Sequence, residues 1–355
     1  MYNNKYIKYS NKLKQLGSGD LAKLPTDVIP FNQLYIPSLI TLYRTSNQTI
    51  RDLFHEYKSF DFYNQRLPDN VSLREFRQIF PHCKGVNISG LNITDADLIH
   101  LCGIEKISIA HCRQITDNAF VHLRGIHTLN MAFCKQITDA AFIHLRGIHT
   151  LDMAYCTQLT DAAFIHLRGI HTLKMESCNQ ITDVAFTHLR GIHTLDMSGC
   201  RQITDIAFVH LRGIQNLDIS HCDQLTNTAF TNLRGIHTLI MFLCRQITDE
   251  AFINLRNIHT LDISGCPGVT DAAFVHLRGI KKLIMNNRWV HLNISDVIFQ
   301  YLNGIEYLDM SLCFNITPAA VHHLRNIQYL NMFGCRQDTK AEARRIGLPV
   351  IEDPN

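Results

Sequence analysis

The chain has 355 residues, with 34 Lys and Arg against 31 Asp and Glu, and a formal net charge of +3. This small charge does not suggest a protein dedicated to nucleic acid or to a membrane surface, so we expect neither as a partner. No run approaches the roughly 18 consecutive apolar residues of a membrane span. Residues 1–19 are polar and contain lysines without an apolar core, so we expect a disordered N-terminus and no signal peptide.

Residues 20–62 carry the spacing of short helices. Pro25 and Asp27 stand where a helix begins, since a proline and an acidic residue both suit the first turn. Apolar residues then recur at helical spacing in two groups, at 39, 42 and 43 and at 50, 53 and 54. We therefore predict a small helical domain over 20–62, followed by a connector over 63–85.

Part of this segment resembles an F-box. The matching residues are Leu24-Pro25-x-Asp27-Val28-Ile29 and Ser38-Leu39-x-x-Leu42. The resemblance implies an intracellular substrate receptor of a cullin-type ubiquitin ligase, which binds an Skp-type adaptor. It implies adaptor binding by the apolar residues Leu24, Pro25, Ile29, Leu39 and Leu42. Pro30 departs from the family pattern, because it breaks a helix that normally continues. Alternatively, these helices only cap the first unit of the array that follows.

A period of 22 residues governs most of the remaining chain. Eight cysteines mark it, at Cys112, Cys134, Cys156, Cys178, Cys200, Cys222, Cys244 and Cys266. A constant period of this size indicates a repeat array. In one unit, Leu195 and Met197 alternate as in a short strand, and Thr204 suits the N-cap of a helix. Each unit therefore predicts a strand, a turn and one to two helical turns.

The recurring pattern Leu-x-Met-x-x-Cys-x-x-Ile-Thr-Asp resembles the cysteine-containing subclass of leucine-rich repeats. The resemblance covers 86–335 and implies an α/β solenoid, curved, with parallel strands on the concave side and helices on the convex side. We expect about 11–12 units, a C-terminal cap over 336–355, and short convex helices, because the unit is shorter than in that subclass. An F-box directly before such repeats is a familiar arrangement. Near-identical units also resemble the F-box and repeat proteins of large DNA viruses, which act in the host cytoplasm or nucleus.

One unit departs from the period. Leu283 and Leu308 are 25 residues apart, and this longer unit holds Trp289, the only tryptophan of the chain. A tolerated bulge is the simpler interpretation. The alternative is an aromatic anchor for a partner, because tryptophan is enriched at binding hot spots.

The spacing of the abundant cysteines favours a structural role over a catalytic or metal-binding one. They occur once per unit, which forms a ladder and not the four-ligand cluster of a zinc site. We predict free thiols that fill the turns and donate weakly to backbone carbonyls, with no metal and no cofactor. No phosphate-binding glycine loop, His-Glu-x-x-His or Gly-x-Ser-x-Gly pattern is present, so we predict no enzyme. A metal or redox sensor is the remaining alternative for the ladder.

Histidine and arginine also recur in each unit. They form either a basic stripe for an acidic partner or caps at helix ends, with the Asp of each Thr-Asp as counter-charge. We favour the second interpretation, since the net charge is small and no aromatic residues interleave with the arginines.

The strand residues beside the core pair are the candidates for partner binding. The proposed target-binding residues are Asp218, Ile240, Phe242, Asp262, Ile284, Tyr307 and Tyr329. An apolar patch with an acidic rim resembles an interface core, and the rim predicts a partner with a basic segment. The expected function is the substrate-recognition subunit of a Skp–cullin–F-box ubiquitin ligase. The alternative is a non-catalytic interaction scaffold or inhibitor.

Overall fold

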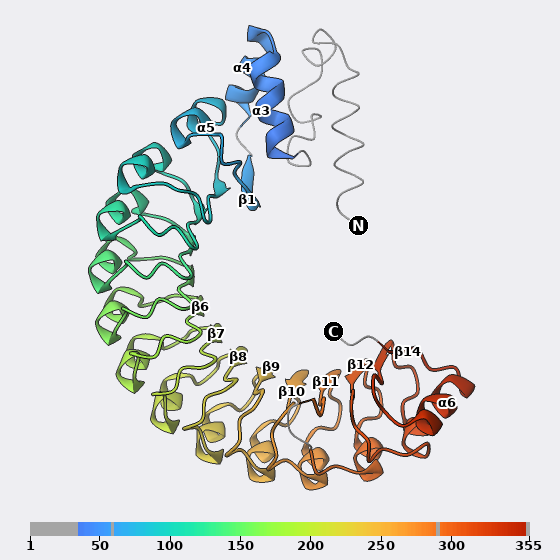
Figure 1. Ribbon diagram of the computed structural model, residues 1–355. Coiled ribbons are helices and arrows are strands. Elements are labelled where there is room, and N and C mark those ends of the chain that lie inside the picture. The colour runs from blue at the N-terminus through green and yellow to red at the C-terminus, as the bar shows by residue number, and fades with distance from the viewer. Residues whose placement is uncertain (1–34, 58–59, 289–291, 353–355) are drawn as a thin grey trace. The chain divides into compact units, whose positions relative to one another are not determined.

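The computed structural model describes residues 35–57, 60–288 and 292–352. The chain divides into two compact units, Met1–Gln158 (unit 1) and Leu159–Asn355 (unit 2). In both, a repeat consists of a three-residue strand, a turn and a short helix (Figure 1). Neighbouring strands are parallel and follow one another in chain order, which is the solenoid arrangement that the 22-residue period predicts.

Unit 1 begins, in its described part, with α-helices that lead into the sheet. Its helices are α3 (Ile36–Thr45), α4 (Gln48–Glu56), α5 (Leu73–Ile79), η2 (Asp95–Leu101), η3 (Asp117–Leu123) and η4 (Asp139–His144). Its strands, in pairing order, are β1 (Asp61–Arg66), β2 (Gly85–Asn87), β3 (Lys106–Ser108), β4 (Thr128–Asn130) and β5 (Thr150–Asp152). The sheet therefore starts at Asp61, before the expected first strand at Val86.

Unit 2 repeats the same plan. Its helices are η5 (Asp161–His166), η6 (Asp183–His188), η7 (Asp205–His210), η8 (Asn227–Asn232), η9 (Asp249–Asn254), η10 (Asp271–His276), η11 (Asp296–Tyr301), η12 (Ala320–His323) and α6 (Gln337–Arg345). Its strands are β6 (Thr172–Lys174), β7 (Thr194–Asp196), β8 (Asn216–Asp218), β9 (Thr238–Ile240), β10 (Thr260–Asp262), β11 (Lys282–Ile284), β12 (Tyr307–Asp309), β13 (Tyr329–Asn331) and β14 (Val350–Ile351). The last strand lies within the expected C-terminal cap, so the sheet continues into that cap.

The repeat helices are 3₁₀ helices of four to seven residues, as expected for a short repeat. Thr204 begins η7 as predicted, because its hydroxyl accepts a hydrogen bond from the Ile206 amide at 3.3 Å. Gly213 follows the helix with a φ of +87°, where a residue with a Cβ would be strained. Capping and chain reversal thus fit into one short repeat.

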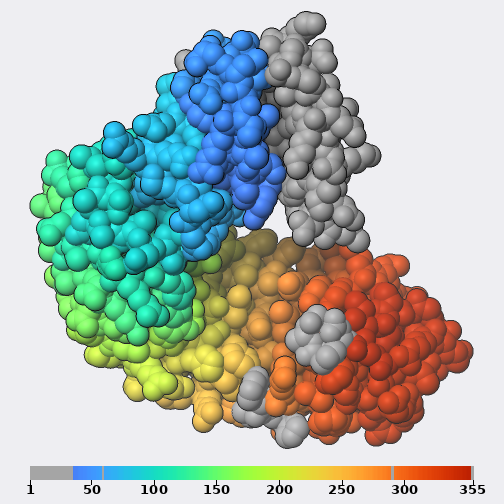
Figure 2. Space-filling model, turned by 45° about the horizontal axis from the view of Figure 1, so that its top comes forward, coloured from blue at the N-terminus to red at the C-terminus, as the bar shows by residue number. Residues whose placement is uncertain are grey.

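The core is a column of equivalent side chains. Leu195, Met197 and Phe208 are each at most 1% exposed, and the same positions are buried in neighbouring repeats. Figure 2 shows the surface colour of unit 2 changing gradually along its repeats, so each repeat borders chiefly its sequence neighbours. The fold therefore depends on stacking, because one repeat cannot bury its own apolar side chains.

The cysteine ladder belongs to this core. All twelve cysteines are free, and eleven of them are buried. Cys200 donates from Sγ to the Met175 carbonyl at 3.1 Å, and Cys134 donates to the Ile109 carbonyl at the same distance. Burial raises the pKa of the Cys200 thiol to about 12. The predicted thiol-to-carbonyl contact is confirmed, and it ties each turn to the strand of the preceding repeat.

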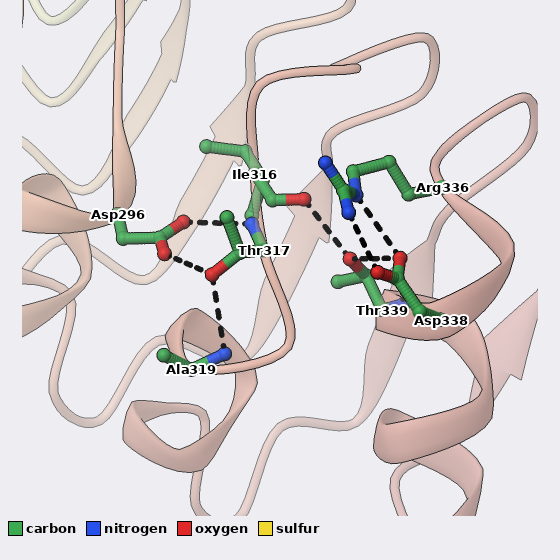
Figure 3. A network of polar contacts seen from close by, with 7 residues as sticks. All are labelled: Asp296, Ile316, Thr317, Ala319, Arg336, Asp338 and Thr339. Carbon is green, nitrogen blue, oxygen red and sulfur yellow. Dashed lines mark hydrogen bonds and ion pairs between the residues drawn. The ribbon is translucent and has the colours of Figure 1, made fainter.

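A second ladder joins the helix starts. Asp205 accepts hydrogen bonds from the amide and hydroxyl of Thr226 in the next repeat, the first at 2.9 Å. Figure 3 shows the last such pair, Asp296 with Thr317, whose hydroxyl also accepts from the Ala319 amide. The interpretation of these aspartates as counter-charges for Arg and His is therefore wrong. Their carboxylates satisfy the amide that opens the next helix.

The arginines bind a different acceptor. Arg190 donates from Nε to His210 Nδ1 at 3.3 Å, and Arg212 donates to Asn232 Oδ1 at 3.0 Å. Each arginine thus contacts the last residue of the 3₁₀ helix in the following repeat. In the described residues, no helix is long and apolar enough to cross a membrane, and no group of three or more candidate metal ligands occurs.

Candidate protein-binding face

Four of the predicted target-binding residues, on β8 to β11, form an ordered row with Asp309 on β12 of unit 2. The register pairs Asp218 with Ile240, Ile240 with Asp262, Asp262 with Ile284, and Ile284 with Asp309. Acidic and apolar side chains therefore alternate from β8 to β12. We call these five residues the strand-face row. All five are half-buried, on the opposite side of their strands from the buried leucines.

The aspartates of the row have a local structural role that sequence reasoning missed. Asp218 Oδ1 accepts from the Ser220 amide at 2.9 Å, and Asp262 Oδ1 accepts from the Ser264 amide at 2.8 Å. Such Asx turns fix the chain where the strand ends. Asn331 makes the same bond to the Phe333 amide at 3.0 Å. The sequence signal was available, because Asp or Asn fills this position in most repeats.

Ile240 and Ile284 cannot make this turn. At β11 the Ser264 hydroxyl accepts from the Asn286 amide at 3.2 Å, in place of the missing carboxylate. The two isoleucines are only half-buried, so they do not belong to the core column. Neither local hydrogen bonding nor core packing therefore explains why these two repeats carry isoleucine.

The row carries negative charge that other side chains leave largely unbalanced. Burial raises the pKa of Asp218, and the charges of Asp196 and Asp262 raise it further. Burial likewise raises the pKa of Asp262, where Asp309 adds repulsion and Lys282 opposes it. None of the ion pairs between described residues includes a carboxylate of the row. The charged face is thus held at a cost in stability.

Phe242 lies two residues beyond Ile240, in the turn that follows β9. Its half-buried ring meets the ring of His221 edge-on, with centroids 5.2 Å apart and planes at 82°. The turn therefore adds a second half-buried apolar side chain two residues after Ile240. The register places Asp218 and Asp262 on either side of Ile240, and the shared binding patch of Ile240 and Phe242 stays a prediction.

Tyr307 and Tyr329 form a second group on this face. Their rings stack with centroids 4.1 Å apart and planes at 1°, and Lys282 Nζ lies 4.3 Å from the Tyr307 ring centroid. Burial, aided by a hydrogen bond with Tyr329, raises the pKa of Tyr307 to about 12. Lys282 was not among the predicted site residues, although its strand position matches the two tyrosines.

The predicted adaptor-binding residues are only partly within the described chain. Leu24, Pro25 and Ile29 lie outside the described residues, as does Trp289. Leu39 is completely buried in α3, while Leu42 is half-buried. Leu39 thus packs inside the protein, and adaptor binding stays a prediction.

Comparisons with known proteins agree on the fold. No curated protein matches the chain. A Listeria monocytogenes internalin structure is 17% identical with a TM-score of 0.60, covering 92% of this chain and 98% of that one. TLR13 in its complex with ssRNA13 is 18% identical, with a TM-score of 0.56, over 78% of this chain and 44% of that one. Drosophila Toll in its complex with Spatzle is 14% identical, with a TM-score of 0.53, over 73% and 37%.

This chain matches less than half the length of the Toll and TLR13 chains. The family model for the BspA type leucine-rich repeat region matches in six copies, over residues 57–170, 93–214 and 157–281. These matches span well over half of the 355 residues. The chain therefore belongs to the BspA-type leucine-rich-repeat family.

Proposed function

We propose that the chain is a recognition protein that binds a target protein through the strand-face row, Phe242 and the Tyr307–Tyr329 pair. The observation that carries this proposal is the isoleucine at 240 and 284. These residues replace an Asx turn on a half-buried surface, although the fold gains no core packing from them. A surface with apolar centres and a charged rim suits a protein interface.

Substitution at 240 tests this role while preserving the local turn. Ile240→Asn removes the apolar side chain, and asparagine makes the required Asx turn at Asn331. We expect Ile240→Asn and Phe242→Ser to lose the partners that the wild-type chain captures in affinity purification from its native cells. Ile206→Asn is the matched control, because Ile206 is 69% exposed on η7, away from this face. Equal capture by all four proteins contradicts the site.

The F-box resemblance supports a more specific role for this binding. The chain then presents its target to a ubiquitin ligase as the substrate-recognition subunit, with residues 20–62 bound to an Skp-type adaptor and its cullin. A pull-down with purified Skp-type adaptor tests this step. Binding that is lost in Leu24→Ala/Pro25→Ala supports direct docking. An intact chain that does not bind the adaptor contradicts it.

One observation favours the alternative of a scaffold or inhibitor without an adaptor. Leu39 is 0% exposed, and β1, which follows α4, pairs with β2 as part of the sheet. The described helices therefore fit a cap that covers the end of the array. The same adaptor pull-down separates the two roles, because a cap leaves target capture intact without binding the adaptor.

A further inference from the structure

We propose that the partner segment on the strand-face row is a basic amphipathic α-helix that lies across the strands. Its cationic side chains face Asp218, Asp262 and Asp309, and its apolar side chains face Ile240 and Ile284. This inference rests on the proposed function and adds the chemistry and conformation of the bound segment.

The negative charge of the strand-face row favours a cationic partner. Three of the five row residues are aspartates, and none of them takes part in an ion pair with another described residue. The charge of Lys282, which lies over the Tyr307 ring, opposes the raised pKa of Asp262 only in part. Lysine or arginine from a partner would relieve the repulsion that raises the pKa of Asp218 and Asp262. The same carboxylates repel an anionic partner such as nucleic acid.

The carboxylates are also held in place before a partner arrives. The Ser264 amide donates to Asp262 Oδ1 at 2.8 Å, and the Ser311 amide and hydroxyl donate to Asp309 Oδ1 at 3.0 and 2.7 Å. A fixed carboxylate loses little side-chain entropy when a cation binds it. The Asx turns that end the strands therefore also prepare the charged positions of the face.

The spacing of the strand-face row favours a partner segment in the α-helical conformation. Neighbouring strands are about 4.8 Å apart, so Asp218 and Asp309, four strand steps apart, are separated by about 19 Å. One face of an α-helix presents a side chain about every 3.5 residues, or about 5.3 Å. Fourteen residues of helix rise about 21 Å. The spacing of side chains along the helix therefore matches the length of the strand-face row to within about 2 Å.

The side-chain spacing of an extended segment does not match the spacing of the strand-face row. Side chains on one face of a strand recur at about 6.7 Å, which falls between row positions when the segment crosses the sheet. An extended segment could therefore place a cation at one aspartate but not an alternating series. The helix pattern that fits has basic residues about seven apart, with an apolar residue three or four positions after each of the first two.

Synthetic peptides test the proposal with full-length protein. The probe is a helical peptide of about 18 residues with lysines at i, i+7 and i+14 and leucines at i+3, i+4, i+10 and i+11. One control peptide has the same composition with the lysines moved to the opposite face. A second replaces two non-contacting residues in the centre with proline, which prevents the helix. Binding is measured by fluorescence anisotropy at low and at physiological salt.

We expect the probe to bind the wild-type protein at least about tenfold more tightly than either control, and more weakly as salt rises. Ile240→Asn and Asp262→Asn should each remove most of this advantage, while Ile206→Asn should not. Equal binding of the proline peptide overturns the helical partner, and equal binding of the shifted peptide overturns the register. If Phe242→Ser abolishes capture of native partners while the probe does not bind, the proposed function stands and this inference fails. If neither Ile240→Asn nor Phe242→Ser reduces capture, the proposed function itself fails.

Discussion

Asp205 accepts two hydrogen bonds from Thr226, one from the amide nitrogen at 2.9 Å and one from the hydroxyl. Because the Thr226 hydroxyl donates to this carboxylate, its oxygen is free to accept from the Thr228 amide at 3.3 Å and to cap η8. The carboxylate of one repeat therefore orients the cap of the next. This relay links neighbouring helices by side-chain hydrogen bonds.

The chain contains its own variation of the relay. Asn227 replaces the aspartate in the following repeat and accepts from the Thr248 amide at 2.9 Å, while its amide nitrogen is 2.7 Å from the Thr248 hydroxyl. Thr248 makes no side-chain capping bond to η9. An asparagine thus keeps the acceptor for the amide but not the orientation of the hydroxyl.

We expect Asp205→Ala to lower the free energy of unfolding by about 2 kcal/mol, because the Thr226 amide loses a charged acceptor. Asp205→Asn should cost about 1 kcal/mol, since it keeps the amide bond but loses the cap, as at Asn227. Denaturant unfolding followed by circular dichroism measures both. Similar losses for the two variants would contradict the relay.

The sequence predicts much of this fold, but it does not predict which polar side chains contact one another. The period fixes the stacking, and residues such as Leu195 and Cys200 are buried as their positions predict. The predicted partner of Asp205 was wrong, because the sequence shows which residues are close along the chain, such as those of the same helix and its arginine. It does not show that the threonine of the next repeat lies beside Asp205 in the stacked array. The Asx turn of Asp262 was missed for a similar reason: an acidic residue on a strand face resembles a binding residue even when it holds its own backbone.

The Arg–His contacts predict a pH dependence. Arg124 donates from Nε to His144 Nδ1 at 3.1 Å, which requires that nitrogen to be unprotonated. Burial, with the charge of Arg124, lowers the pKa of His144 from 6.5. The unfolded chain therefore binds this proton more readily, so the contribution of His144 to stability is present above about pH 6.5 and is lost as the pH falls.

His144→Asn should remove this contribution and flatten the dependence. Asparagine is a native acceptor at the equivalent position, where Arg234 donates to Asn254 Oδ1 at 3.3 Å. We expect the variant to match the wild-type melting temperature at pH 7.5 and to exceed it at pH 5.5. A wild-type protein that loses no more stability than the variant over this range would show that the histidine is not titrating in this way.

Thiol reactivity should separate one cysteine from the other eleven. Cys102 is the exposed cysteine of the twelve, and its Sγ is 3.7 Å from His122 Nδ1. Burial raises the pKa of thiols such as Cys83 and Cys222 to about 12, which leaves them protonated and enclosed. We expect Ellman's reagent to modify one thiol quickly in the native protein and twelve in denaturant. Cys102→Ser should abolish the fast reaction, and a fast phase of several thiols would contradict the buried ladder.

The aspartates of the strand-face row should lower the stability of the fold while they favour binding of a cationic partner. Burial raises the pKa of Asp262 in the folded protein, so the folded state holds its proton to a higher pH than the unfolded chain. Stability is therefore lost as the pH rises from about 3.8 through the raised pKa. Asp262→Asn removes this charge and keeps the turn, because Asn331 makes the same bond.

We accordingly expect Asp262→Asn to melt at a higher temperature than the wild type at pH 7, with a difference that shrinks toward pH 4. The same variant should bind the basic helical probe at least about tenfold more weakly, since a cation on the face loses its partner. Thermal unfolding at several pH values and anisotropy titrations measure the two effects on one protein sample. A variant that is less stable at pH 7 would mean that the carboxylate serves the fold. In that case its position on the face would no longer argue for recognition.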